Sequence, residues 1–211
     1  MWLENDELRV FFDEKRGGMP TEDSFGFLRA ASIEIGYTAQ FPFFQSLNDK
    51  HPWMEKRGNT VTAQGFVSKG KITGSNAYKM VATLNGNELS LAFELNVARE
   101  EEITRSKIWL WTNEPLDKCM MSGKILDKGA GPEDSAWRWL YDGKQPKEPI
   151  VFLGVEGKLE ILGTTIPSIY ASVISLKKYP KLETAFGWAV DSFQKGVYSG
   201  NFLLTYKGHD E

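Results

Sequence analysis

Alternation of apolar and polar side chains is clearest at residues 88–97. Leu89, Leu91, Phe93, Leu95 and Val97 alternate there with Ser90, Ala92, Glu94 and Asn96. A period of two residues predicts a strand with one buried face and one wetter face. The preceding run, Tyr78–Leu84, predicts a partner strand. Asn85-Gly86 between them predicts a tight type I′ turn, because both residues tolerate positive φ. The stretch is therefore predicted to be an antiparallel hairpin.

Further short apolar runs predict strands along the rest of the chain. They are Leu8–Phe12, Ser32–Tyr37, Thr60–Val67, Ile103–Thr112, Ile150–Val155, Lys158–Leu162, Ser168–Leu176, Thr184–Val190 and Val197–Tyr206. Many short strands separated by turn residues are typical of an all-β sandwich or barrel. We predict an all-β, antiparallel β-sandwich. No Ser/Gly tract or charge block divides the 211 residues, so a single domain over residues 1–211 is expected.

One helix is expected, within the long interruption at Asp127–Pro149. In Gly131–Gly143 a proline stands near the start, acidic residues follow it, and a glycine ends the run. Trp137, Leu140 and Tyr141 would share one face of that helix. This face is expected to cover one end of the sandwich.

Charge and apolar content exclude several classes of partner. The 25 basic and 28 acidic residues are interspersed, with a net charge of −3, so the chain lacks the extended basic face that nucleic acid requires. No apolar run approaches the roughly 20 residues of a membrane span. Clustered His and Cys residues, acidic calcium loops and phosphate-binding glycine loops are also missing, so neither a metal site nor a cofactor is expected.

Cys119 is the only cysteine, which rules out a disulfide within the chain. Residues 1–7 show no basic segment followed by an apolar one, so no signal peptide is expected. Both features favour a cytoplasmic location. The mature form of a bacterial exported protein would share them.

Two passages resemble a known group of proteins. Residues Leu3–Phe12 followed by Arg16-Gly17-Gly18, and the strands within Tyr78–Thr112, are similar to the galactose-mutarotase-like supersandwich group. The resemblance covers about a quarter of the chain and implies a large antiparallel sandwich that binds or processes a sugar. Epimerases of that group use histidines and a carboxylate over the sugar ring, whereas this chain has only His51 and His209. A noncatalytic or divergent relative is therefore expected.

The segment Asn48–Asn59 is predicted to be a loop and carries the densest set of candidate residues. Asp49, Trp53 and Arg57 could contact a sugar, with the indole stacking on the ring and the charged groups bonding hydroxyls. If the protein is an enzyme, His51 is the first choice for acid/base work, because histidine exchanges protons near neutral pH. The alternative is a surface loop that Trp53 anchors in the core.

Two further aromatic groups are candidates for ligand binding. Trp109 and Trp111 lie two residues apart and so on one face of a strand, which would suit stacking against a glycan. In Trp137-Arg138-Trp139, an exposed Trp139 beside Arg138 could form a binding platform. Packing in the core explains both groups as well.

We therefore expect a carbohydrate-associated β-sandwich whose ligand is a mono- or oligosaccharide. An enzyme of this kind would be a sugar epimerase, glycoside hydrolase or polysaccharide lyase-like protein. The alternative is a noncatalytic structural or interaction subunit whose aromatic surfaces form a protein–protein interface. A homo-oligomer is compatible with either alternative.

Overall fold

The computed structural model describes residues 1–6, 8–17, 36–38, 44–102, 105–111, 118–125, 137–144, 148–153, 157–163, 168–174, 183–186 and 192–208. Within these ranges every paired strand is antiparallel, and the one helical element is a short 3₁₀ turn, η1 (Ser46–Asn48). The predicted all-β class is thus confirmed. In the described part of the chain no helix has the length and apolar character needed to cross a membrane.

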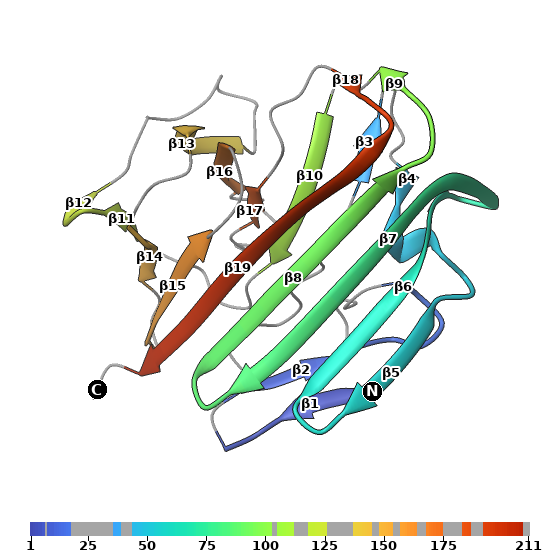
Figure 1. Ribbon diagram of the computed structural model, residues 1–211. Helices are drawn as coiled ribbons and strands as arrows, with labels where there is room; N and C mark the ends of the chain where they lie inside the picture. Colours follow the sequence, from blue (N-terminus) through green and yellow to red (C-terminus); the bar gives the residue numbers. More distant parts are fainter. Residues whose placement is uncertain are drawn as a thin grey trace.

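One large sheet contains most of the strands (Figure 1). Its order is β12-β11-β14-β15-β19-β8-β7-β6-β4-β3-β10-β17, and β5 also pairs with β6. The bounds are β3 Gly36–Thr38, β4 Phe44–Gln45, β5 Trp53–Arg57, β6 Thr60–Lys69, β7 Ile72–Asn85, β8 Glu88–Val97, β10 Arg105–Trp111, β11 Lys118–Met121, β12 Lys124–Ile125, β14 Ile150–Leu153, β15 Gly157–Gly163, β17 Glu183–Phe186 and β19 Gly196–Gly208.

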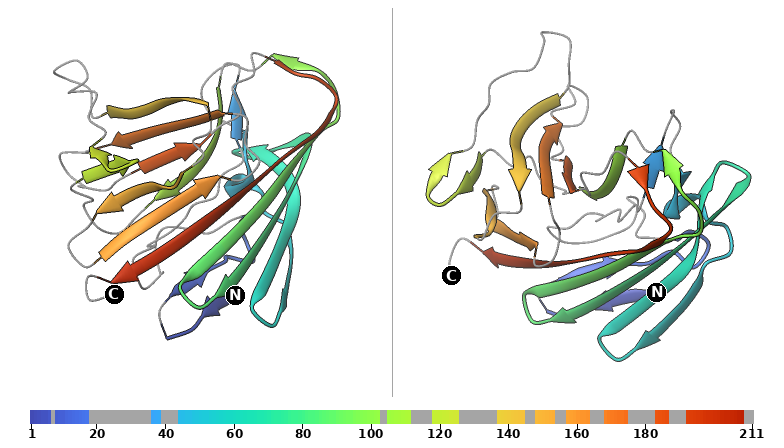
Figure 2. Two further views of the ribbon diagram at one scale, coloured as in Figure 1. Left: turned by 60° about the vertical axis from the view of Figure 1, so that its left-hand side comes forward. Right: turned by 45° about the horizontal axis from the view of Figure 1, so that its top comes forward.

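Three two-stranded sheets complete the described structure. They pair β1 (Trp2–Glu4) with β2 (Arg9–Phe11), β13 (Trp137–Lys144) with β16 (Ser168–Ile174), and β9 (Glu101–Glu102) with β18 (Ser192–Phe193). The large sheet is curved, and β10, β17, β16 and β13 follow one another in a second layer (Figure 2). The result is a β-sandwich.

The hairpin of β7 and β8 is confirmed at the centre of the sheet, but its turn differs from the prediction. Asn85 pairs with Glu88, so the two turn residues are Gly86 and Asn87. Gly86 has a φ of +55°, and Asn87 does not have a positive φ. A positive φ at the first turn residue alone is the sign pattern of a type II′ turn, in which glycine occupies that position. The predicted type I′ turn at Asn85-Gly86 is therefore wrong.

The hydrophobic core lies on the inner face of the central strands. The buried side chains of β8 are Leu89, Leu91, Phe93, Leu95 and Val97, the five that the alternation predicted. Leu3, Leu8, Val10 and Phe12 reach the same core from β1, β2 and the residues beside them. The rings of Phe93 and Phe202 pack with centroids 5.4 Å apart. Burial of these apolar side chains supplies the main driving force for folding.

The helix expected at Gly131–Gly143 is wrong for residues 137–143, which belong to strand β13; residues 131–136 lie outside the described part. In its pairing with β16 the register shifts between Trp139 and Tyr141. Such a bulge adds one residue to one strand and interrupts the two-residue alternation. The resulting spacing of apolar residues resembles that of a helix. Pairing of residues 137–144 with β16 nevertheless makes them a strand.

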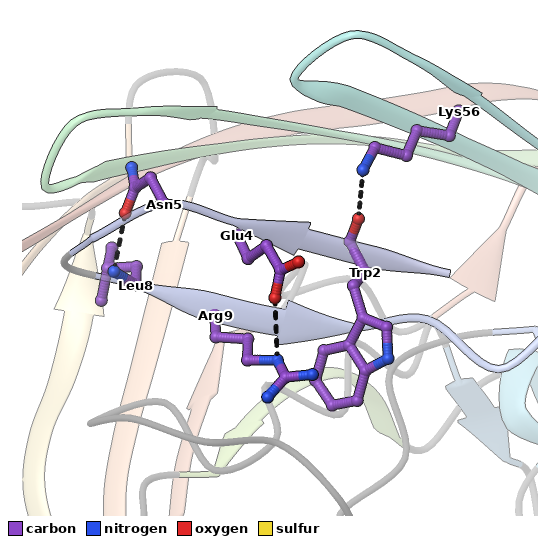
Figure 3. A network of polar contacts seen from close by, with 6 residues as sticks. All are labelled: Trp2, Glu4, Asn5, Leu8, Arg9 and Lys56. Carbon is purple, nitrogen blue, oxygen red and sulfur yellow. Dashed lines mark hydrogen bonds and ion pairs between the residues drawn. The ribbon is translucent and has the colours of Figure 1, made fainter.

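Polar contacts hold the β1–β2 hairpin together and join it to β5 (Figure 3). At its turn, Asn5 Oδ1 accepts a hydrogen bond from the Leu8 amide at 2.8 Å. The Arg9 guanidinium lies 3.9 Å from the centre of the Trp2 ring, and its Nε is 3.1 Å from a Glu4 carboxylate oxygen. Lys56 on β5 donates to the Trp2 carbonyl at 2.7 Å. The hairpin therefore supports β5 at the margin of the sheet.

Candidate functional site

Four of the predicted site residues, Asp49, His51, Trp53 and Arg57, lie on one continuous segment. The loop prediction for Asn48–Asn59 is wrong for residues 53–57, which form strand β5 and pair with β6 from Trp53–Gln64 to Arg57–Thr60. The turn between these strands is Gly58-Asn59, and Gly58 has a φ of +57°. Gly-Asn is a hairpin signal, so this strand was detectable from the sequence.

Strand pairing aligns exposed residues in a row across the outer face of the sheet. Trp53 is opposite Gln64, Gln64 opposite Lys79, Lys79 opposite Glu94, and Glu94 opposite Ser199. All five are exposed. Directly opposed residues on one face of a sheet lie close enough for their side chains to interact. The row therefore places an indole beside polar and charged groups on one surface.

Phe66 extends this surface, because it lies two residues beyond Gln64 on β6 and so on the same side of the strand. Trp53 is 49% exposed and Phe66 is 48% exposed. We use the term Trp53 face for Trp53, Gln64, Phe66, Lys79 and Glu94. The aromatic pair at one end and the polar groups beside it give the face both apolar and hydrogen-bonding character.

Arg57 is on the same side of β5 as Trp53 and makes an ion pair with Glu55. Its Nη2 lies 2.9 Å from Glu55 Oε1, and 81% of the Arg57 side chain is exposed. An exposed pair of this kind contributes at most about 1 kcal/mol to stability. The guanidinium can therefore leave Glu55 for another acceptor at little cost.

His51 and Asp49 precede β5 and differ sharply in environment. His51 is exposed, and its backbone amide donates to Asp49 Oδ1 at 3.0 Å. Asp49 is buried. Its Oδ2 accepts hydrogen bonds from the Phe66 amide at 3.0 Å and from the Tyr78 hydroxyl at 3.1 Å. The imidazole of His51 is therefore available to solvent, whereas the Asp49 carboxylate is engaged within the protein.

Tyr78 is a buried residue of β7, and the nearby Asp49 carboxylate affects its pKa. Burial of the phenol raises the pKa of Tyr78 well above its ordinary value, and the charge of Asp49 and the hydrogen bond to it raise the pKa further. The tyrosine is consequently a hydrogen-bond donor under all ordinary conditions.

Two glycines leave room for the Asp49–Tyr78 pair. A Cβ on Gly65 would overlap Asp49 Oδ2, and a Cβ on Gly17 would overlap the Tyr78 hydroxyl and press on the Ser46 carbonyl. Gly17 belongs to the Arg16-Gly17-Gly18 stretch that follows the first two strands in the sequence. The close approach of backbone to the Tyr78 hydroxyl explains why a glycine is needed at position 17.

The other predicted site residues lie on different strands. Trp109 and Trp111 are on β10, while Trp137, Arg138 and Trp139 are on β13; β17 and β16 separate these two strands in the second layer. In the sheet order, β6, β4 and β3 lie between β5 and β10. The side chains of these residues lie outside the described part of the structure, which places only the strands that carry them. Among the described residues, no group of three or more His, Cys, Asp or Glu is placed to hold a metal ion.

The residues that sequence reasoning missed are Gln64, Phe66, Lys79 and Tyr78. The period of two in β6 and β7 assigns the first three to the side away from the core. Their common row, however, depends on which strands pair and in which register. No local signal shows that Tyr78 reaches Asp49.

Two solved structures are similar to this chain over nearly its whole length. The galactose mutarotase related enzyme from Lactobacillus acidophilus gives a TM-score of 0.57 at 9% identity and covers 98% of this chain and 97% of that chain. A galactose mutarotase-like protein from Lactobacillus casei ATCC 334 gives a TM-score of 0.57 at 10% identity, with 99% of each chain covered. No protein-family model and no curated protein matches the sequence. The predicted galactose-mutarotase-like fold is confirmed, and at these identities the likeness concerns the fold alone.

Proposed function

We propose that this protein binds a carbohydrate on the Trp53 face. The observation that carries the proposal is the half-exposed indole of Trp53 at the end of a row of polar side chains on β6, β7 and β8. An indole offers a flat apolar surface for the C–H side of a sugar ring. The fold, which it shares with galactose mutarotase-like proteins, supports a sugar as the ligand.

Each side chain of the face has a proposed role in binding. The sugar stacks on Trp53, and Phe66 extends the apolar floor. Gln64 both donates and accepts hydrogen bonds, while Lys79 donates and Glu94 accepts, which suits the mixed demands of hydroxyl groups. Arg57 reaches the ligand from the same side of β5 when it exchanges its Glu55 partner. The charges on the face are of both signs, so an uncharged ligand suits it.

Asp49 and His51 take different parts in the proposal. The oxygens of Asp49 already accept three hydrogen bonds from the protein, so we assign it to supporting the segment that precedes Trp53. The exposed imidazole of His51 is our choice for proton transfer if the bound sugar is also converted.

The decisive experiment titrates the purified protein with mono- and oligosaccharides and detects binding by isothermal titration calorimetry and by NMR. A hit should shift the indole N–H signal of Trp53, and Trp53→Ala should weaken binding at least tenfold. Thr205→Ala, on the outer face of β19 away from Trp53, serves as the control and should leave affinity unchanged. If the Trp53→Ala variant binds the sugar as tightly as the wild type, the binding site would instead lie in the second layer. Trp109→Ala, Trp111→Ala, Trp137→Ala, Arg138→Ala and Trp139→Ala test that layer.

A protein–protein interface is the second candidate, because three large apolar side chains at outward-facing positions of β5, β6 and β19 are at least 48% exposed. They are Trp53, Phe66 and Val197. Exposed apolar side chains on one surface are typical of interaction sites. Light scattering that shows a stable oligomer, together with no response to any sugar, would favour this function. Phe66→Asp should then dissociate the oligomer.

A further inference from the structure

Asp49 occupies a gap in the pairing of β6. On one edge of β6, β5 pairs as far as Gln64, and β4 pairs at Ser68. No described strand pairs with residues 65–67 along that edge. The Asp49 carboxylate lies in this gap and accepts the Phe66 amide hydrogen at 3.0 Å. It therefore supplies the acceptor that a neighbouring strand would otherwise provide.

The same carboxylate fixes the chain that connects β4 to β5. After η1, Asp49 Oδ1 accepts the amide of His51, a local turn that aspartate forms readily. On the other side, Tyr78 on β7 donates to Oδ2 at 3.1 Å. Three donors from separate segments thus determine where the carboxylate lies and how it is directed.

The surroundings leave the pair little freedom. Asp49 is 7% exposed and Tyr78 is 2% exposed. Gly65 packs so closely against Asp49 Oδ2 that a Cβ would overlap it, and Gly17 does the same to the Tyr78 hydroxyl. Close packing on both sides means that the carboxylate cannot turn away without breaking hydrogen bonds.

We propose that Asp49 is a positioning residue, which holds the His51–Trp53 segment on the edge of β6 so that Trp53 meets Gln64. This inference depends on the proposed function only in naming a carbohydrate as the ligand that binds beside Trp53. Tyr78 acts through Asp49 by fixing one of its oxygens. The turn at Gly58-Asn59 holds the other end of β5, so Asp49 and this turn together determine the register of the strand.

Amide hydrogen exchange on the full chain tests the proposal without any sugar. In Asp49→Ala, exchange at both His51 and Phe66 should rise at least tenfold relative to Leu91 on β8. Asp49→Asn keeps one oxygen, so His51 should stay protected while Phe66 loses protection. Tyr78→Phe should raise exchange at Phe66 about threefold, and it serves if Asp49→Ala does not fold. Tyr198→Phe removes a hydroxyl that bonds the Gln194 carbonyl and is the matched control.

The outcomes separate the positioning role from the sugar. Unchanged exchange at His51 and Phe66 would refute the role, and so would an equal rise at Leu91, because that reports general destabilisation. If the wild type binds a sugar, Asp49→Ala should weaken binding at least tenfold and Asp49→Asn less. Unchanged affinity would then disprove the link to the site. If no sugar binds the wild type, the proposed function fails, and the exchange data alone decide whether Asp49 positions the segment.

Discussion

The Tyr78 hydroxyl donates a hydrogen bond to the Asp49 carboxylate across 3.1 Å, and both side chains are buried. The two residues are 29 positions apart and belong to different elements, one before β5 and one within β7. A buried carboxylate is stable only when donors surround it. The pair therefore joins the candidate binding segment to the central hairpin.

Tyr78→Phe should lower the free energy of unfolding by about 1.5–3 kcal/mol, because it removes a hydrogen bond to a charged, buried acceptor. Urea unfolding followed by circular dichroism measures the change. Tyr198→Phe, whose hydroxyl donates to the exposed carbonyl of Gln194, should cost less than about 1 kcal/mol. Equal losses of unfolding free energy in the two variants would show that the buried hydrogen bond of Tyr78 stabilises the protein no more than an exposed one.

Stability should fall with pH above about 10, the ordinary value for a tyrosine, because the fold raises the pKa of Tyr78. The folded protein then holds a proton that the unfolded chain has released. The stabilisation is complete below that pH and is lost as the pH rises. The slope should be up to about 1.4 kcal/mol per pH unit. Parallel urea titrations between pH 9 and 11 should show a steeper decline in the wild type than in Tyr78→Phe.

Gly65→Ala should destabilise the protein by about 1–3 kcal/mol, because the new methyl group overlaps the Asp49 carboxylate. Gly208→Ala is the matched control, since a Cβ there meets nothing within 4 Å, and it should be neutral. In an Asp49→Ala background the methyl group has room, so Gly65→Ala should cost less than in the wild type. Additive effects of the two substitutions would argue against the overlap.

Gly86→Ala should cost about 1–2 kcal/mol, because alanine is strained at a φ of +55°. Asn87→Ala should be close to neutral, since its φ is not positive. Thermal or urea unfolding of the two variants distinguishes the turn types. A type I′ turn would place strain at both central residues, so a loss at Asn87 would contradict the type II′ pattern.

The strand content could be predicted from the sequence because alternation is a local signal. Leu89, Leu91 and Phe93 are buried as their spacing indicates, and most predicted strands exist within a few residues of their expected ends. Two local errors remain. The predicted loop at Asn48–Asn59 contains β5, whose hairpin Gly58-Asn59 marks, and the bulge in β13 gives residues 137–143 a helix-like spacing.

The candidate site was less predictable because its parts come together only through strand register. Residue type and proximity in sequence indicate Asp49, His51 and Trp53 as candidates, but give none of their partners. Nothing local to Asp49 indicates that its partners are Phe66 and Tyr78. The row from Trp53 to Glu94 likewise depends on three pairings that alternation alone does not define.

The position of β19 in the sheet has a consequence for how the chain folds. This strand lies between β8 and β15, and Gly196 pairs with Val97, roughly a hundred residues earlier. During synthesis, the edge of β8 that pairs with β19 therefore stays unpaired until almost the whole described chain has been made. Such distant pairing slows folding and leaves an apolar strand open to aggregation. We expect refolding yield to depend strongly on protein concentration, and a chaperone that shields exposed strands should raise it.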